Sequence, residues 1–440
     1  MCRAEIAVTI GRDECLALDT ADRLAPLRAH FALQDVDDRH VIYLDGNSLG
    51  VLPTATAARV QQVVRDEWGR DLIRSWNSAG WITWSQRIGD KIARLVGAAP
   101  GELTVADSTS VNLYKVLNAA IALAAADAPD RRRIVSERTN FPSDVYIADT
   151  VAREHSLELI LVDADEMPQH LDDRLAVLLL THVNYRSGRM HRMDAMTRAA
   201  HDAGALMIWD LAHSAGAVPV NLHGGGTPDD AADFAVGCGY KYLNGGPGAP
   251  AFVWAHPRHT ERMDREHWRQ PLSGWLGHAD PFEFAASYSP GTGISRFLCG
   301  TPPVLSLAAL ECGVDVFLAA EAYGGLDALR DKSIALTGLF IDLVESRCAG
   351  HDLTLVTPRD GGDRGSQVAF AHPTDGYAIM QALIAHGVIG DFRAPDILRF
   401  GFTPLYTRFI DVWEAVDRLA RVLHGGQWRE PRFTVRATVT

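Results

Sequence analysis

The sequence predicts an α/β protein with a large domain, in which helices flank a mostly parallel sheet, and a smaller α+β domain at its C-terminal end. Through the middle of the 440 residues, short apolar runs alternate with helical patterns, which is typical of a parallel sheet with helices on both faces. Several of these runs are almost wholly apolar, as expected for strands that are covered on both sides. After Pro302 and Pro303 the alternation stops and a long Ala- and Leu-rich segment follows.

The elements of the large domain follow from these runs. Seven strands are expected, at Leu103–Ala106, Arg133–Glu137, Leu157–Asp163, Leu175–Val183, Ala205–Asp210, Phe234–Gly239 and Ala251–Ala255. Helices are expected between them, at Val111–Ala125, Asp144–Glu154 and Asp194–Ala203. Ligands of such sheets bind beyond the carboxyl ends of the strands. The residues directly after each strand are therefore the candidates for function.

The smaller domain is expected to begin with Val304–Ala319, an apolar segment that predicts a buried linking helix. The elements expected after it are helices near Ser333–Arg347, Tyr377–His386 and Ile410–Leu423, and strands near Ser366–Phe370 and Ile397–Gly401. The segment before about Ala55 shows no regular pattern, so we expect it to be irregular and to wrap onto the domains. We therefore divide the chain into an N-terminal segment (residues 1–55), a large domain (56–303), and a linking helix with the small domain (304–440).

The composition excludes several classes of protein. Apolar residues make up 47% of the chain and charged residues 22%, which is too apolar and too weakly charged for intrinsic disorder. Lys and Arg number 42 against 55 Asp and Glu, so no nucleic-acid partner is expected. The apolar runs are too short or too interrupted to span a bilayer, and the N-terminal residues lack the apolar core of a secretory signal. The six cysteines form no CxxC pair, which indicates free thiols in a reducing compartment and a cytoplasmic protein.

Two strand ends carry the strongest indication of chemistry. Asp210 ends an apolar strand, where a buried carboxylate needs a partner, and Lys241 follows the next apolar strand. An acid and a lysine at one edge of a sheet suit pyridoxal phosphate, because the lysine forms a Schiff base with the aldehyde and the acid pairs with the pyridinium nitrogen. The alternative is a structural salt bridge between the same two residues.

A phosphate site is expected to accompany this pair. The segment Asp107-Ser108-Thr109-Ser110 follows the first strand and opens a helix. Hydroxyls and backbone N–H groups at a helix N-terminus bind anions, so Thr109 and Ser110 are candidates for the phosphate, although an ordinary N-cap explains the same residues. A nucleotide-binding Rossmann enzyme would need a Gly-rich first turn, and this segment contains no glycine.

Other residues near these strand ends are further candidates for the site. Phe141, after the second strand, can stack on a pyridine ring, and Asp144 can contact the cofactor, whereas Pro142 between them is ordinary helix-start chemistry. Asp210 and His213 are spaced like two metal ligands. No third ligand stands at a suitable spacing, so no metal site is expected.

Seven segments, in the same order as in the family, resemble the bacterial kynureninases. These are members of the aspartate-aminotransferase-like (fold type I) pyridoxal-phosphate enzymes. The segments run from about residue 40 to residue 405, nearly the whole chain. One such segment alone is modest support, whereas seven in order are specific. They are Leu44–Gly50, Asp107–Leu113, Phe141–Asp144, Asp210–Ser214, Tyr240–Asn244, Leu272–His278 and Leu398-Arg399.

The resemblance implies roles around the cofactor. Lys241 resembles the Schiff-base lysine, Asp210 the partner of the pyridinium nitrogen, and His213 the histidine packed beside the ring. Tyr240 resembles a tyrosine that binds the phosphate and relays protons, so Lys241, Tyr240 and Asp210 are expected to be catalytic. Further cofactor contacts are implied for Thr109, Ser110, Phe141, Asp144 and Thr181.

The resemblance also implies a homodimer and a substrate clamp. Trp275 resembles a tryptophan that reaches the cofactor of the other subunit, and Thr301 is expected to do the same. Arg399 resembles the arginine that clamps the substrate carboxylate, a task that suits a guanidinium fork, and Ser48 is a second candidate for binding substrate. Animal kynureninases carry Asn at the position of Thr301. In having Thr there, this chain resembles the bacterial form. That favours L-kynurenine, although a threonine can still accommodate the ring hydroxyl of 3-hydroxykynurenine.

The activity implied is the pyridoxal-phosphate-dependent hydrolysis of the Cβ–Cγ bond of L-kynurenine to anthranilate and L-alanine, in tryptophan degradation and NAD biosynthesis. A cysteine desulfurase or an aminotransferase-like lyase is the second interpretation. A desulfurase needs a nucleophilic cysteine on a mobile loop, and the candidates, Cys299 and Cys348, stand in no such motif. A third interpretation is a non-enzymatic binding protein of this fold, which loss of Lys241 or Asp210 would have favoured; both are present.

Overall fold

The computed structural model describes residues 10–33, 40–225 and 230–436. These residues form two compact units, and each is described by itself. The larger unit contains Leu52–Tyr185 and Met190–Leu318, and the smaller contains the described residues up to Val51, Arg186–Arg189, and the chain from Ala319 onwards. The predicted α/β class is confirmed. The domain boundaries expected at residues 55 and 303 stay predictions.

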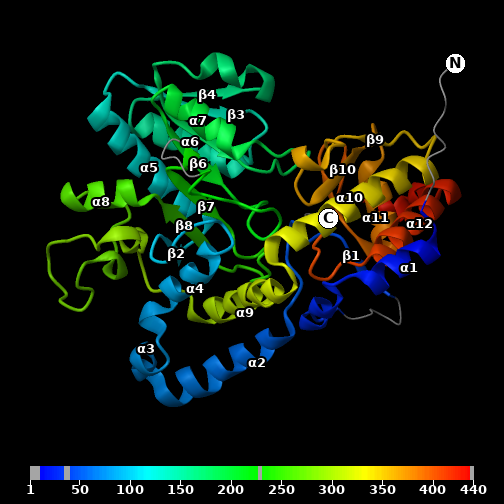
Figure 1. The fold of residues 1–440 in the computed structure, drawn as a ribbon, viewed down its shortest axis with the longest axis horizontal. Coiled ribbons are helices and arrows are strands. Elements are labelled where there is room, and N and C mark those ends of the chain that lie inside the picture. The colour runs from blue at the N-terminus through cyan, green and yellow to red at the C-terminus, as the bar shows by residue number, and fades with distance from the viewer. Residues whose placement is uncertain (1–9, 34–39, 226–229, 437–440) are drawn as a thin grey trace. The chain divides into compact units, whose positions relative to one another are not determined.

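A seven-stranded sheet forms the centre of the larger unit (Figure 1), with the strand order β2-β8-β7-β6-β5-β3-β4. In that order the strands are Leu103–Ala106, Ala251–Ala255, Phe234–Gly237, Leu206–Asp210, Leu175–Thr181, Arg133–Glu137 and Glu158–Val162. The pairs from β7 to β4 are parallel, whereas β8 runs antiparallel to both of its neighbours. The expectation of a mostly parallel sheet is therefore confirmed. The reversed direction of β8 has no counterpart in the sequence pattern, because a buried apolar run looks the same in either direction.

Helices cover both faces of this sheet. Helix α5 (Thr109–Asp127) packs along β5 to β8 and shares an apolar core with Ile208 of β6. The next residue in that strand, Trp209, donates from Nε1 to Thr197 Oγ1 of α7 (Met193–Asp202) over 3.1 Å. Neighbouring residues of a strand point to opposite faces, so α5 and α7 lie on opposite sides of the sheet.

The larger unit contains more helix than the sequence patterns predict. Helices α6 (Pro142–Glu154) and α9 (Val304–Ala320) occupy the residues expected for them. The expected linking helix α9 lies in the larger unit up to Leu318. The additional helices are α2 (Thr54–Gln62), α3 (Ser75–Ser78), α4 (Trp84–Ala93) and α8 (Pro257–Arg265), with a π-helical stretch at Val63–Asp71. Helices α2, α3 and α4, all within the described chain, begin without a side-chain cap hydrogen bond, so the usual local support of a helix start is missing.

The smaller unit combines an antiparallel sheet with three long helices. Its four strands, in the order β12-β13-β10-β9, are Asp391–Arg393, Ile397–Gly401, Gln367–Ala371 and Thr354–Leu355. A short parallel pair joins β1 (Ile42–Tyr43) to β11 (Val388–Ile389). The helices are α10 (Gly325–Arg347), α11 (Gly376–Ala385) and α12 (Phe409–Gly425).

The apolar core of the smaller unit is rich in phenylalanine. The ring of Phe340 in α10 lies 4.8 Å from that of Phe400 and 5.2 Å from that of Phe402, centroid to centroid. These contacts join α10 to the end of β13. Burying such rings is a large apolar contribution to stability, so this core holds the sheet that carries Arg399.

The described residues bear on two further expectations, which concern membrane-spanning helices and the state of the cysteines. Within them, no helix is long and apolar enough to cross a membrane. The five cysteines that the structure describes are free thiols, as predicted. They are Cys15, Cys238, Cys299, Cys312 and Cys348, whereas Cys2 lies outside the described residues.

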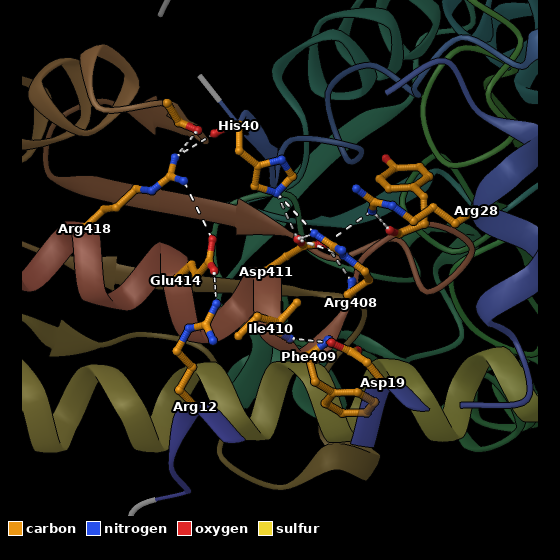
Figure 2. A network of polar contacts seen from close by, with 12 residues as sticks. Arg12, Asp19, Arg28, His40, Arg408, Phe409, Ile410, Asp411, Glu414 and Arg418 are labelled. Carbon is orange, nitrogen blue, oxygen red and sulfur yellow. Dashed lines mark hydrogen bonds and ion pairs between the residues drawn. The ribbon is translucent and has the colours of Figure 1, made fainter. Parts of the chain in front are cut away.

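The N-terminal segment was expected to be irregular, but it contains helix α1 (Arg12–Ala21), so that expectation is wrong. The reason is tertiary. Asp19 near the end of α1 accepts the backbone N–H groups of Phe409 (2.7 Å) and Ile410 (3.0 Å) at the start of α12. Figure 2 shows this contact. A short helix of this kind is marginal alone and is stabilised by what it packs against.

A buried carboxylate, Asp411, holds the same end of α12 (Figure 2). Its oxygens lie 2.7 Å from Arg408 Nη2, 3.2 Å from Arg28 Nη1 and 3.4 Å from His40 Nε2. Burial alone would raise the pKa of Asp411, but the hydrogen bonds from His40 and Arg408 and the charge of Arg28 lower it well below its usual range. Residues from the N-terminal segment thus neutralise a charge inside the C-terminal part of this unit.

Replacing the acceptor on α1 tests this attachment. Asp19→Ala leaves two N–H groups at the start of α12 without their side-chain acceptor, and we expect it to lower the free energy of unfolding by about 1 kcal/mol. Urea unfolding followed by circular dichroism measures the change. The matched control is Asp13→Ala, an exposed acid of the same helix, for which a change below about 0.5 kcal/mol is expected. Equal losses in both variants would contradict the capping role.

Candidate active site

Two of the predicted site residues end neighbouring parallel strands. Thr181 is the last residue of β5 and Asp210 the last of β6, and they are paired in register. Lys241 follows β7, the next strand of the sheet. Because the carboxyl ends of parallel strands meet at one edge, the structure brings the acid and the lysine to the same edge of the larger unit.

The amine of Lys241 lies among aromatic side chains. Lys241 is only 8% exposed, and its Nζ lies 2.9 Å from His213 Nε2. The same nitrogen is 5.6 Å from the ring centroid of Phe141 and 5.7 Å from that of Tyr240. The structure thus gathers four of the residues predicted to surround the cofactor, and this packing holds the amine in one place.

The turn that carries Lys241 is closely packed from behind. The N–H of Asn244 donates to the Lys241 carbonyl over 2.9 Å, and Asn244 adopts φ +56°. Helix α9 passes so near that a Cβ on its Gly313 would come within 2.2 Å of the Leu243 carbonyl oxygen. Glycine is needed at Gly313 for this approach, which fixes the backbone beneath the lysine.

A pair of buried carboxyl groups stands beside the lysine. Asp210 is 3% exposed and Asp144 is 2% exposed, and their side chains share a hydrogen bond. Burial and then the nearby Asp210 raise the pKa of Asp144 well above its usual range. Burial also raises the pKa of Asp210, against the charge of Lys241 and a 2.7 Å hydrogen bond from the Ala212 N–H.

This carboxyl pair can hold one proton between two acids. Two carboxylates in contact cannot both ionise readily. A protonated Asp144 donates to an ionised Asp210, which then remains a carboxylate able to pair with a cationic ring nitrogen. Thr181 supports the arrangement, because its Oγ1 lies 3.4 Å from Asp144 Oδ2 and also bonds to Asn140.

The predicted phosphate site lies at the start of α5. Ser108 is the N-cap residue, and its Oγ accepts the Val111 N–H over 3.3 Å. Thr109 and Ser110 are half-buried in the first turn. Because Ser108 supplies the cap, the ordinary N-cap explanation does not require Thr109 or Ser110. Their hydroxyls, with the N–H groups of the first turn, suit an anion.

Trp275 and Thr301 contact each other at the surface of the larger unit. Trp275 Nε1 donates to Thr301 Oγ1 over 3.2 Å, and Thr301 is exposed. Among the described residues, no hydrogen bond, ion pair or ring contact joins either to Lys241 or Asp210. The Trp275 ring borders an apolar hollow of ≈ 780 Å³, lined by Ile73, Arg74, Trp76, Asn77, Ile82, Trp275, Phe282 and Phe284.

The two predicted substrate-binding residues meet in the smaller unit. Arg399 of β13 is 1% exposed, and its Nη2 donates to Ser48 Oγ over 2.8 Å. Its Nε donates to Asp391 Oδ1 over 2.8 Å, and its Nη2 also contacts this carboxylate. Asp391 is absent from the sequence prediction. It is paired with Arg399 in register across β12 and β13, and an antiparallel hairpin at 391–401 would have pointed to it.

A second acid, the half-buried Asp45, lies near this ion pair. Burial would raise the pKa of Asp391, but the charge and hydrogen bond of Arg399 lower it. Asp45 has no such partner for its Oδ1. Burial and then the negative charge of Asp391 raise the pKa of Asp45 to about 7. Asp45 therefore changes charge near neutral pH beside the guanidinium that is predicted to bind substrate.

The titration of Asp45 predicts a pH-dependent stability. The folded protein keeps a proton on Asp45 that an unfolded chain, with a pKa near 3.8, has released, so this stabilisation is present at low pH and is lost as pH rises toward 7. Asp45→Asn stays neutral throughout. We compare the free energy of unfolding of this variant with that of the unaltered chain. As pH rises from about 5 to about 8, we expect the difference to shift in favour of the variant by ~1–3 kcal/mol.

Urea unfolding at both pH values measures this difference. The exposed Asp13→Asn serves as the control, because its carboxyl is close to solvent in both states. A stability difference between Asp45→Asn and the unaltered chain that does not change with pH would contradict the raised pKa.

The described residues contain no group of three or more His, Cys, Asp or Glu side chains arranged to hold a metal ion. His213, the second half of the spacing that suggested metal ligands, contacts Lys241 instead. The site is thus built from an amine, an imidazole, a carboxyl pair and hydroxyls at a helix start.

Comparison with known proteins adds family information to this geometry. Residues 329–419 match the family model described as the kynureninase C-terminal domain. The chain is 55% identical over 432 residues to a kynureninase of Pseudomonas fluorescens, with 98% of this chain and 99% of that protein covered. It is 56% identical over 433 residues to a kynureninase of Burkholderia pseudomallei, with the same coverage.

Solved structures of lower identity share the fold. A cysteine desulfurase from Thermococcus onnurineus matches with a TM-score of 0.71 at 17% identity, covering 88% of this chain and 95% of that one. The cysteine desulfurase CsdA from Escherichia coli matches with a TM-score of 0.71 at 18% identity, covering 91% and 98%. At this identity the likeness concerns the fold alone.

Proposed function

The chain belongs to the kynureninase family, and from this premise we propose that it hydrolyses L-kynurenine to anthranilate and L-alanine with pyridoxal phosphate held at Lys241. The observation that carries the proposal is the placement of Lys241 and Asp210 at one edge of the sheet. The amine lies beside His213 and two aromatic rings. This set of groups fits the aldehyde, the ring face and the ring nitrogen of the cofactor.

The residues around the amine would divide the chemistry among them. When bound, pyridoxal phosphate supplies an electron sink for carbanions formed next to the substrate amine. Asp210, supported by the Asp144 proton, holds the ring nitrogen protonated. Lys241 removes the proton from the substrate α-carbon and returns it at the end. Tyr240 donates a proton to the β-carbon as anthranilate leaves.

The substrate carboxylate would be bound by Arg399 with Ser48. Asp391 engages both Nε and Nη2 of the guanidinium, so the fork is held in one orientation. A planar, pre-oriented fork binds a carboxylate with two parallel hydrogen bonds. Arg399 and Ser48 are thus proposed as the pair that recognises an α-amino acid.

A desulfurase activity is the less favoured alternative. Cys348 is 3% exposed, and burial raises the pKa of its thiol to about 12. Cys299 donates from Sγ to the Leu272 carbonyl over 2.9 Å, and burial also raises its pKa. A nucleophilic cysteine needs a lowered pKa and exposure, so neither thiol is suited to attack sulfur.

We also propose a homodimer in which Trp275 and Thr301 reach the cofactor of the neighbouring subunit. Support comes from the apolar surface around them: Phe282 is 57% exposed, Phe284 81% and Ile73 76%. An exposed apolar area of this kind is typical of a protein interface. A second copy of the chain would cover it and would use the Trp275–Thr301 pair as part of its own site.

The proposed reaction is tested by its fluorescent product. Purified protein loaded with pyridoxal phosphate is mixed with L-kynurenine, and anthranilate fluorescence is expected to rise. Lys241→Ala should abolish the rise, because no other group would hold the cofactor and move the α-proton. The control is Lys91→Ala. It removes a lysine of α4 that pairs with Glu311 and Asp315 of α9, and this variant should remain active.

The same assay separates the alternatives. Full turnover by Lys241→Ala would contradict the assignment of the lysine. If the unaltered protein binds pyridoxal phosphate but does not turn over L-kynurenine, the proposed substrate is wrong. The compounds to try next are then 3-hydroxykynurenine and cysteine.

Hybrid dimers test the cross-subunit proposal. Lys241→Ala subunits lack the amine, and Trp275→Ala subunits lack the tryptophan. If Trp275 serves the neighbouring cofactor, each hybrid dimer contains one complete site, and random mixing should restore about a quarter of the unaltered sites. The measurement is anthranilate formation before and after the two variants exchange subunits. Activity that stays at the sum of the two separate variants would place Trp275 in the site of its own subunit.

A further inference from the structure

A fully buried lysine lies directly behind the predicted phosphate site. Lys115, in the second turn of α5, has no exposed side-chain surface. Its ammonium contacts the carboxylate of Asp107, donates to the Phe297 carbonyl over 2.6 Å and lies 3.3 Å from Asn112 Oδ1. A charge so deeply buried is costly unless it is fully bonded, and the three contacts satisfy all three of its N–H donors.

The partner of this lysine stands immediately before the phosphate site. Asp107 precedes the N-cap Ser108 and adopts φ +45°, a conformation that non-glycine residues rarely occupy. Its carbonyl accepts the Ala251 N–H of β8 over 2.9 Å, and its side chain is about 30% exposed. A carboxylate at this point repels an incoming phosphate, and the Lys115 ammonium offsets that repulsion.

Lys115 also reaches the chain segment that leads to Thr301. Phe297, which accepts its second hydrogen bond, begins a stretch that packs on residues 270–277. The Leu276 N–H donates to the Cys299 carbonyl over 3.1 Å, and a Cβ on Gly274 would come within 2.4 Å of the same oxygen. One buried ammonium thus joins the start of α5 to the segment that holds Trp275 and Thr301.

We propose that Lys115 is a positioning residue for the phosphate end of the cofactor: it neutralises Asp107 and fixes the strained turn that presents Thr109 and Ser110. The proposal rests on the pyridoxal phosphate of the proposed function. It assigns Lys115 no contact with the phosphate and no part in proton transfer. Its effect should therefore depend on the phosphate group and not on the ring or the aldehyde.

The test compares two probes that differ only in the phosphate. Dissociation constants of pyridoxal phosphate and of phosphate-free pyridoxal are measured on apoenzyme by quenching of tryptophan fluorescence. Lys115→Met fills the same space without charge. We expect it to weaken pyridoxal phosphate roughly tenfold or more, and to change pyridoxal by less than about twofold.

A second substitution separates electrostatics from loss of packing. In Lys115→Met with Asp107→Asn, the uncompensated carboxylate is gone, so most of the affinity for pyridoxal phosphate should return. The matched control is Lys332→Met in the smaller unit, which removes another buried lysine, bound to Asp22 over 2.7 Å and to the Pro404 carbonyl over 2.8 Å. It should lower the melting temperature and leave both dissociation constants unchanged.

Two outcomes would overturn the proposal. In one, Lys115→Met weakens pyridoxal and its phosphate ester equally. In the other, the double variant binds pyridoxal phosphate as poorly as the single variant. The readout uses no kynurenine, so failure of the proposed reaction appears in the anthranilate assay, and failure of this proposal appears in the binding comparison.

Discussion

The requirement that every buried charge be paired organises this protein. Removing an ion from water costs several kcal/mol unless partners replace the lost hydration, and the interior of each unit holds ions that meet this condition. Asp210 is bonded to Asp144 and to the Ala212 N–H, and Arg399 is bonded to Asp391. Each partner fixes the direction of a group that the chemistry would use. The polar groups are thus oriented before any ligand arrives, because turning one away would leave its partner buried and unpaired.

The larger unit separates two kinds of electrostatic environment. At the end of β6, burial and the neighbouring Asp210 raise the pKa of Asp144, so this carboxyl pair can hold one proton and still offer a negative charge to a cationic ring nitrogen. At the start of α5, a helix N-terminus with hydroxyl side chains favours an anion, and Lys115 offsets a nearby carboxylate, Asp107. A cofactor with a basic ring nitrogen at one end and a phosphate at the other fits this separation. The proposed reaction uses the first environment for chemistry and the second for binding.

Elements that are buried on both faces were predicted most accurately. The bounds of β2, β3 and β8 agree with the sequence expectation residue for residue, because apolar, β-branched runs have few alternatives inside a helix-covered sheet. Helices α1, α2, α3, α4 and α8 were missed, although Trp84, Ile88 and Ile92 of α4 recur at helical spacing on one buried face. Helix α1 exists because Asp19 and its neighbours pack against α12, and no local pattern records a partner almost four hundred residues away. The same limit applies to Asp391, whose relation to Arg399 depends on strand pairing.

The sequence by itself determined the α/β class, the family, and the residue types at the strand ends, because motif order and apolar periodicity are local properties of the chain. Tertiary structure alone decided which of those residues meet. It brought Asp144 to Asp210, reversed β8, and placed Lys115 behind the phosphate turn with Asp107 and Phe297 as its partners. The physical reason is that a buried charge is stabilised by whatever polar group folding brings within hydrogen-bond distance, and that distance is set by packing between elements far apart in the chain.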